Sequence, residues 1–410
     1  MTYLEKYTCL KNLYNPFDSL MVNPENGTEI HNLPFDSKSW CLLPGADKYV
    51  CDKHDIEFAE ALGHREPQLY ETYPDTLKDH DFEFEENRKF NYTIIRQSNG
   101  AKSKGVIFLL HGLNEKTWDK YLPWAEKLVE LTGKAVILFP IAFHMNRAPK
   151  GWGDSRLMHK VASSRQAHSP SIMNSTFANS AISSRIQTIP QRFFWSGLQT
   201  FFDVEQLITE IRSGEHALID GNATIDLFSY SIGSFLSEIL LMSNPQNYFS
   251  DSRLFIFCGG PTLDRMLPNS KFILDSDATI ALYSFYTERL DMEIRHDKRM
   301  AHYFMGDHPA GRYFKAMLNY HKEKETREER LKELFEQICA VALKKDSVIP
   351  PYEVTNTLKG ENRDIPVNVE VLDFPYPYDH ITPFPAKKEL EDAVDRSFNK
   401  VFEIAASHLG

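Results

Sequence analysis

One serine of this chain stands between a predicted strand and a predicted helix. Ser231 follows the apolar run 223–228, which is typical of a buried strand, and precedes residues 234–242, whose apolar spacing is helical. A sharp turn at such a junction pushes the serine hydroxyl out of the sheet. A serine hydroxyl is a poor nucleophile at neutral pH, so it needs a base within reach and an acid that orients the base. The alternative is that Ser231 only caps the helix, a position that serine favours.

The sequence supplies an acid and a base after two later strands. Asp346 follows the apolar run 339–343, and His380 lies in the loop after the apolar run 367–372. A histidine on such a loop can reach back over the sheet edge, so we expect His380 to be the base and Asp346 the acid that fixes its imidazole. His380 could instead be a loop histidine packed among tyrosines. Two other carboxylates are rivals for the acid: Asp264 and Asp373.

Continuous apolar runs alternate with helical patterns from residue 105 onward. The runs 105–110 and 135–140 flank a helical pattern over 121–131, which predicts a βαβ unit and hence a parallel sheet. Before them, alternating patterns predict two half-exposed antiparallel strands over 82–85 and 90–95. Further strands are expected over 254–258, 339–343 and 367–372, and further helices over 193–211, 234–242, 328–338 and 387–409.

These patterns define a core of residues 80–260 and 326–410. Residues 1–79 are expected to form an irregular N-terminal extension packed on the core, with short helices near 56–62. Residues 142–192 are expected to form a long polar insertion. Residues 261–325 are expected to form a helical cap. The polar insertion leaves the carboxyl end of a strand, so it either walls a cleft or forms a mobile surface segment.

Four short motifs along the chain resemble motifs of the α/β-hydrolase superfamily and occur in the order typical of that superfamily. Residues 111–112, His-Gly, resemble the family's oxyanion-loop dipeptide, and residues 229–233 resemble its G-x-S-x-G turn with Ser229 in place of the first glycine. Residues 346–350 resemble the D-x-[VI]-[VI]-P turn that carries the family's acid, and residues 380–384 resemble its H-x-x-P-F histidine loop. The resemblance covers roughly residues 80–410. It implies an α/β-hydrolase fold, with a mostly parallel central sheet and helices on both faces.

The resemblance also implies a serine hydrolase that cleaves an ester-type acyl bond through an acyl-enzyme intermediate. The backbone N–H groups of Leu113 and Ile232 would form the oxyanion hole. His111 would orient the loop that carries Leu113. No cofactor and no metal are implied. A small-molecule carboxylic ester is the expected substrate, with thioesters and peptides as alternatives. Acyl transfer on the same triad and a catalytically silent binding protein are the other functions left open.

Composition limits the partners. The formal net charge of -11 argues against binding to nucleic acid or to an anionic membrane surface. Residues 1–7 do not have the pattern of a signal peptide, and no apolar run reaches the length of a spanning helix. We therefore expect a soluble, cytoplasmic protein, and the sequence does not predict its oligomeric state.

The cysteines and the histidines outside the four motifs carry no predicted chemistry. The five cysteines show no Cys/His zinc spacing, so buried free thiols are expected, with a Cys41–Cys51 disulfide as the alternative in an oxidising compartment. Solvated or core positions are expected for the insertion and cap histidines His144, His159, His296, His302, His308 and His321. Five aromatic residues are expected either to line a cleft or to pack in the core: Trp152, Trp195, Tyr283, Phe285 and Tyr286.

Overall fold

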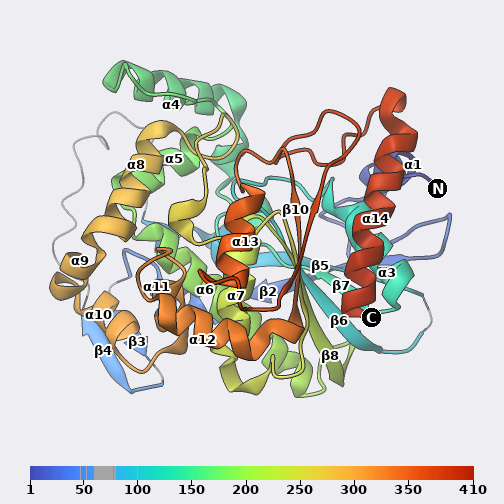
Figure 1. Cartoon of the computed structure of the whole chain (residues 1–410), viewed down its shortest axis with the longest axis horizontal. Coiled ribbons are helices and arrows are strands. Elements are labelled where there is room, and N and C mark those ends of the chain that lie inside the picture. Colours follow the sequence, from blue (N-terminus) through green and yellow to red (C-terminus); the bar gives the residue numbers. More distant parts are fainter. Residues whose placement is uncertain (47, 52, 60–76, 78–79, 99) are drawn as a thin grey trace.

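A nine-stranded sheet lies at the centre of the computed structural model, which describes residues 1–46, 48–51, 53–59, 77, 80–98 and 100–410 (Figure 1). The strand order is β1-β2-β5-β7-β6-β8-β9-β10-β11. Neighbours from β7 to β11 pair in parallel, and neighbours from β1 to β7 pair antiparallel. The bounds are β1 (Leu20–Val22), β2 (Glu29–Asp36), β5 (Lys89–Arg96), β6 (Ser103–Leu110), β7 (Ala135–Leu138), β8 (Ile219–Tyr230), β9 (Leu254–Phe257), β10 (Ile338–Leu343) and β11 (Asn368–Leu372).

Helices cover both faces of this sheet. Side chains of β6 alternate between two cores, with Val106 and Phe108 in one and Ile107 and Leu109 in the other, because successive residues of a strand point to opposite faces. The first core packs against α6 (Arg192–Arg212), α7 (Ile232–Ser243), α12 (Lys324–Leu334) and α13 (Pro351–Lys359), and the second against α1 (Tyr3–Leu13), α3 (Tyr121–Thr132) and α14 (Glu391–Leu409). The predicted fold class, an α/β-hydrolase fold with a mostly parallel sheet between helices, is confirmed.

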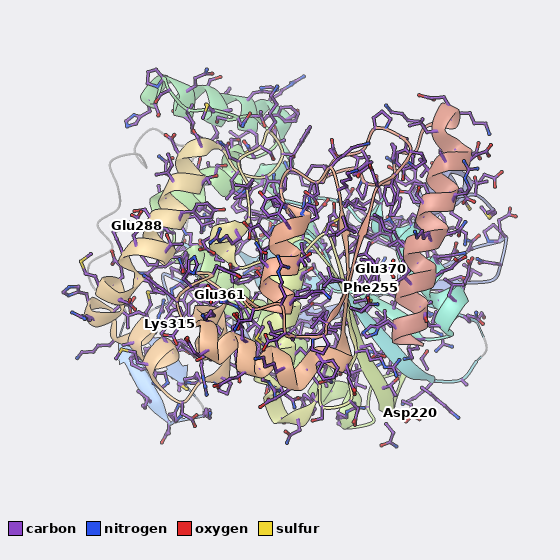
Figure 2. All side chains as sticks on the ribbon, in the orientation of Figure 1. Asp220, Phe255, Glu288, Lys315, Glu361 and Glu370 are labelled. Atoms are coloured by element: carbon purple, nitrogen blue, oxygen red, sulfur yellow. The ribbon has the colours of Figure 1, made fainter. Side chains whose placement is uncertain are left out.

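The strands are buried where the sheet is covered on both faces. Phe255 of β9 is fully buried and lies among the strands at the centre of Figure 2, whereas Glu288 lies on the outer helices. Burying one such phenylalanine contributes about 1.5–3 kcal/mol. This burial explains why the central strands read as continuous apolar runs. The strands and helices predicted from residue 90 onward lie within a few residues of the observed ones, and none was predicted in the polar insertion.

The prediction of an irregular N-terminal extension is wrong. Helix α1 packs against α3 and α14, and β2 pairs with β5 and so brings the first strands into the central sheet. Asn32, at a buried position of β2, hid the alternation; its amide donates to the carbonyls of Asn15 and Asp18. A separate hairpin consists of β3 (Lys48–Cys51) and β4 (Ile56–Ala59). The helix expected near 56–62 is therefore wrong for 56–59, and residues 60–62 lie outside the described ranges.

The strand predicted over 82–85 is also wrong. Residues Asp81–Glu83 form a 3-10 turn that leads into α2 (Glu85–Arg88). The His80 N–H donates to the Glu83 carboxylate at 2.9 Å, which caps this turn. The alternation of phenylalanine and glutamate instead places Phe82 against Trp40 and Phe84 against Phe143.

The polar insertion contains helices α4 (Ser155–His168) and α5 (Ser180–Thr188). Ion pairs occupy several of its buried positions beside a few apolar residues. The Arg165 guanidinium donates to both carboxylate oxygens of Asp275 at 2.8 and 2.7 Å, and Arg185 pairs with Asp81. These charged and serine-rich positions lack the apolar spacing by which a helix is recognised.

The segment expected as a cap is helical. It contains α8 (Ser276–Tyr283), α9 (Leu290–His296), α10 (Lys298–Met305) and α11 (Pro309–Ala316). In Figure 1, α8 to α11 lie on the side of the sheet away from α14. Across the described residues, we find no helix that combines the length and the apolar character needed to cross a membrane.

Candidate active site

Ser231 occupies a strained turn between β8 and α7. Its backbone has φ 57° and ψ −125°, a conformation that L-residues rarely adopt. Such strain costs on the order of 1–3 kcal/mol and concentrates at functional sites. Ser231 stands at the N-cap of α7, but its hydroxyl is hydrogen-bonded to His380 instead of capping the helix.

Two neighbouring residues show how the chain accommodates this turn. A Cβ atom on Gly233 would lie 2.4 Å from the Leu110 carbonyl oxygen, so only glycine lets α7 pack this closely on β6. Ser229, which replaces the first glycine of the motif, is fully buried, and its hydroxyl donates to the Phe255 carbonyl at 3.4 Å. Serine therefore fits this position without loss of the turn.

We expect Gly233→Ala to lower the free energy of unfolding by about 1–3 kcal/mol, because the added methyl group must displace the backbone of β6. The matched change Ser229→Gly removes a side chain without adding a clash and is expected to cost about 0.5–1 kcal/mol. Urea unfolding followed by circular dichroism measures both. If Gly233→Ala is as stable as the parent, the close approach of α7 to β6 does not govern this turn.

The structure brings Ser231, His380 and Asp346 into one hydrogen-bonded chain. His380 Nε2 lies 2.8 Å from Ser231 Oγ, and His380 Nδ1 lies 2.7 Å from Asp346 Oδ2. The His380 and Asp346 side chains are only 3% and 1% exposed. Asp346 Oδ1 accepts the N–H groups of Val348 and Ile349 at 2.9 and 2.8 Å, which fixes the carboxylate in place. An imidazole held between a hydroxyl and an anchored carboxylate is the arrangement that activates a serine.

The rival carboxylates have other partners. Asp264 accepts the Tyr320 N–H at 3.1 Å and the Thr262 hydroxyl at 2.7 Å. Asp373 accepts the Tyr378 hydroxyl at 3.1 Å and pairs with Lys345 at 3.2 Å. Of the three candidate acids, Asp346 is thus the one hydrogen-bonded to His380.

Tyr230 supports the histidine loop, a role that the sequence did not reveal. Its ring stacks on the His380 imidazole with centroids 5.3 Å apart, and its hydroxyl donates to the His380 carbonyl. Burial raises the pKa of Tyr230 well above its usual value, so the hydroxyl stays a donor. Lys120 adds a second tie, because its ammonium donates to the Ile381 carbonyl at 3.1 Å.

His111 holds the loop that follows β6. Its Nε2 accepts the Ile141 N–H at 2.9 Å, and its Nδ1 donates to the Gly112 carbonyl at 2.8 Å. Burial, aided by His144, holds the pKa of His111 well below 6.5, so the ring is neutral. The Gly112 N–H donates to the Tyr121 hydroxyl at 3.0 Å. These hydrogen bonds fix the loop at His111 and Gly112, and Leu113 follows directly in the sequence.

An apolar cavity of about 70 Å³ lies beside this turn. Leu113 and Ile232 both line it, and within the described ranges neither of their backbone N–H groups donates a hydrogen bond. Two free donors beside a serine hydroxyl can stabilise an oxyanion. The other lining residues are Ile141, His144, Phe193, Phe194, Ser196, Gly197, Leu198, Phe201, Phe235, Leu236, Ile239, Ala310 and Phe314.

His144 in this lining was expected to be an ordinary core or solvated histidine. Its Nδ1 donates to the Ala142 carbonyl at 2.9 Å. Its Nε2 is buried and has no hydrogen-bond partner among the residues that the structure describes. Burial lowers the pKa of His144 to about 4, so Nε2 is an unprotonated acceptor at neutral pH.

The aromatic wall of the cavity differs from the expected one. In the described part of the chain, none of the five aromatic residues considered for a cleft lines this cavity. Trp152, Trp195, Phe285 and Tyr286 are buried in the main core, and Tyr283 packs against it. Phenylalanines of α6, α7 and α11 take their place.

The structure of this chain is remotely similar to several solved esterase structures. A thermostable esterase from Pseudomonas putida ECU1011 has a TM-score of 0.41 and 9% identity over 78% of this chain and 80% of that chain. Carboxyl esterase 2 from the fungus Tuber melanosporum has a TM-score of 0.40 and 11% identity over 77% of this chain and 82% of that chain. Esterase LipW from Mycobacterium marinum has a TM-score of 0.39 and 12% identity over 78% of each chain.

Comparison at the level of sequence gives a different kind of result. Among curated proteins, none matches this sequence. One family's sequence model matches residues 1–410, and the chain therefore belongs to the family of unknown function DUF6051.

Proposed function

We propose that the protein is a serine hydrolase of the α/β-hydrolase superfamily that cleaves an ester-type acyl bond. The observation that carries this proposal is the hydrogen-bonded chain from Ser231 through His380 to Asp346, with distances of 2.8 and 2.7 Å. The short distance between Ser231 and His380 favours a working nucleophile over a catalytically silent binding protein.

The reaction follows from these contacts. Ser231 Oγ attacks the acyl carbon while His380 Nε2 takes the hydroxyl proton. The tetrahedral intermediate collapses, and the alcohol leaves with the proton that His380 returns. Water, deprotonated by His380, then attacks the acyl-enzyme. The second tetrahedral intermediate collapses as His380 returns this proton to Ser231 Oγ, and the acid is released. Asp346 holds the imidazole in position and stabilises its protonated form.

In this proposal, the backbone N–H groups of Leu113 and Ile232 hold the oxyanion in both halves of the reaction. Each donor aimed at the developing charge contributes about 3–4 kcal/mol to lowering the barrier. Both residues also line the apolar cavity, so a group that enters the cavity lies next to these donors. The small size and phenylalanine lining favour a short, apolar acyl or alkoxy group.

Hydrolysis of nitrophenyl esters tests this function. We expect turnover of the acetate and butyrate esters by the purified protein and a fall in kcat/KM as the acyl chain grows beyond the cavity. Ester formation with an added alcohol, in preference to release of the acid, would instead indicate an acyltransferase on the same triad. A folded protein that hydrolyses none of these esters, nor the matching thioesters, would contradict the proposal.

A further inference from the structure

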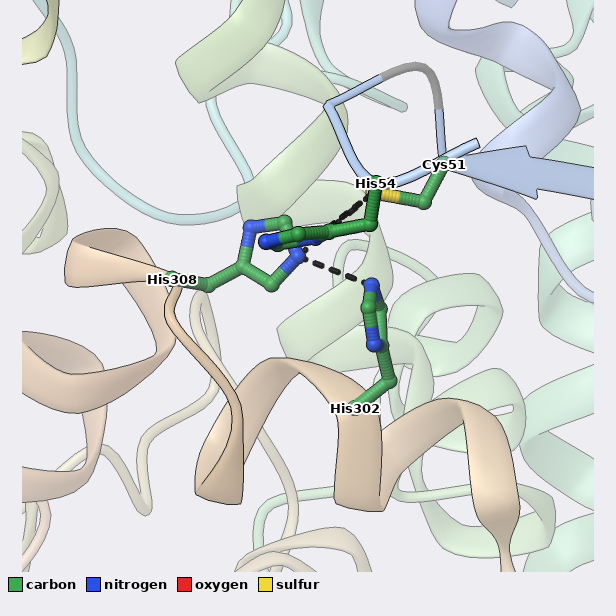
Figure 3. A group of neighbouring side chains, drawn as sticks. All are labelled: Cys51, His54, His302 and His308. Carbon is green, nitrogen blue, oxygen red and sulfur yellow. Dashed lines mark hydrogen bonds between the residues drawn. The ribbon is translucent and has the colours of Figure 1, made fainter. Parts of the chain in front are cut away.

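Four side chains with metal-binding atoms meet at one point far from Ser231 in the sequence (Figure 3). Cys51, His54, His302 and His308 each direct one ligand atom inward, and these atoms all lie within 4.8 Å of one another. Cys51 Sγ lies 3.5 Å from His54 Nδ1 and 3.5 Å from His308 Nε2. His308 Nε2 lies 2.9 Å from His302 Nε2.

These residues come from two parts of the chain that the fold brings together. Cys51 ends β3, and His54 lies in the turn between β3 and β4. His302 lies on α10, and His308 is the residue before α11. Cys51 and His308, which lie in contact, are 257 positions apart in the sequence. The sequence shows no metal-binding spacing for this cluster, because its two halves lie far apart in the chain.

The distances suit a tetrahedral zinc ion. With Zn–S near 2.3 Å and Zn–N near 2.0–2.1 Å, tetrahedral geometry places sulfur and nitrogen ligands about 3.5 Å apart and two nitrogen ligands about 3.3 Å apart. Both observed sulfur–nitrogen distances are 3.5 Å, and the observed nitrogen–nitrogen distance is 2.9 Å. The remaining pairs of ligand atoms lie within 4.8 Å and would draw together around one ion through ring movements.

The chemistry of the donors agrees with this geometry. The His54 ring meets the rings of His302 and His308 edge-on, with centroids 5.0 and 4.7 Å apart, so three imidazoles surround one point. Metal ions bind imidazole in its neutral form and cysteine as its thiolate. Thiolate and imidazole ligands together select zinc over magnesium or calcium.

We propose that Cys51, His54, His302 and His308 bind one Zn²⁺ in a closed structural site that clamps the β3–β4 hairpin onto the cap helices α10 and α11. Binding displaces the Cys51 thiol proton, and the four protein ligands leave no position for a catalytic water. An isolated two-stranded hairpin is marginally stable, so such a clamp has a structural purpose. Because Ala310 and Phe314 of α11 line the apolar cavity, the ion also holds one wall of that cavity.

Metal analysis of the tag-free full-length protein tests this site. We expect about one zinc per chain after dialysis against zinc and gel filtration. Cys51→Ser and His308→Ala should each lose most of it. The matched controls Cys9→Ser and His296→Ala, which change the same residue types outside the cluster, should keep it. A parent protein without zinc, or loaded with another metal in its place, would overturn the proposal, as would full zinc content in the Cys51 and His308 variants.

A second measurement covers the case in which the ligand variants do not fold. The parent protein, stripped of zinc and loaded with Co²⁺, should show a thiolate-to-cobalt charge-transfer band and the intense visible bands of tetrahedral cobalt. The Cys9→Ser control should give the same spectrum. An octahedral spectrum without the charge-transfer band would overturn the proposal. Neither readout depends on esterase activity, so this proposal and the proposed function stand or fall separately.

Discussion

Replacing Ser231 with alanine is expected to lower kcat for ester hydrolysis on the order of 10⁶-fold, as loss of the nucleophile does in other serine hydrolases. The variant lacks the oxygen that attacks the acyl carbon, while its Cβ atom still fills the same place in the turn. Its circular dichroism and thermal unfolding should therefore match those of the parent. Steady-state kinetics on the best nitrophenyl ester measure the loss.

The control for this variant lies on the same helix. Ser243 is the last residue of α7, at the end remote from His380, and Ser243→Ala should leave kcat unchanged. If Ser231→Ala retains more than a small fraction of the parent kcat while remaining folded, Ser231 is not the nucleophile.

Asp346→Asn is expected to lower kcat on the order of 10⁴-fold with little change in fold. An asparagine can still accept the N–H groups of Val348 and Ile349, so the turn after β10 should keep its shape. The amide no longer stabilises the imidazolium that forms when His380 takes the serine proton. If its NH₂ group faces His380, it also holds the ring in the wrong tautomer.

Asp373→Asn is the matched control, because Asp373 is also an acid just after a parallel strand. It pairs with Lys345 and Tyr378, and its replacement should leave kcat near that of the parent. The opposite pattern, with activity lost in Asp373→Asn and kept in Asp346→Asn, would move the acid of the triad to the end of β11.

The parallel half of the sheet could be predicted from sequence because its strands are buried on both faces. A strand such as β6 or β10 then consists almost entirely of apolar residues, and its ends are marked by the first polar ones. Asp346 and His380 could be found for the same reason, since each lies in the loop directly after such a strand. Because parallel strands end at the same edge of the sheet, these two residues and Ser231 can meet in one hydrogen-bonded chain.

The N-terminal strands and the insertion helices could not be predicted because polar side chains fill buried positions there. Asn32 in β2 and Arg165 in α4 are both buried, and each is satisfied by partners distant in sequence. Local periodicity carries no trace of such partners. The Cys51 and His308 contact is an extreme case, because only the folded chain brings the two residues together.

The side chains that line the cavity could not be identified from the sequence, for a third reason. Its phenylalanines belong to three helices, and whether Phe194 or its neighbour Trp195 faces the cavity depends on how α6 packs. The sequence marked this region as aromatic without fixing which ring faces the substrate. His144 became visible as a candidate substrate contact only once its unpartnered Nε2 could be placed in the same lining.

Identifying the residue modified by a fluorophosphonate tests the proposed serine hydrolase most directly. The reagent reacts only with a serine that is activated as a nucleophile, and peptide mass spectrometry locates the adduct. We expect one phosphonyl group per chain, carried by Ser231, and no labelling of Ser231→Ala. A folded parent protein that stays unlabelled, or that carries the adduct on another residue, would contradict the assignment of Ser231, His380 and Asp346 as a catalytic triad.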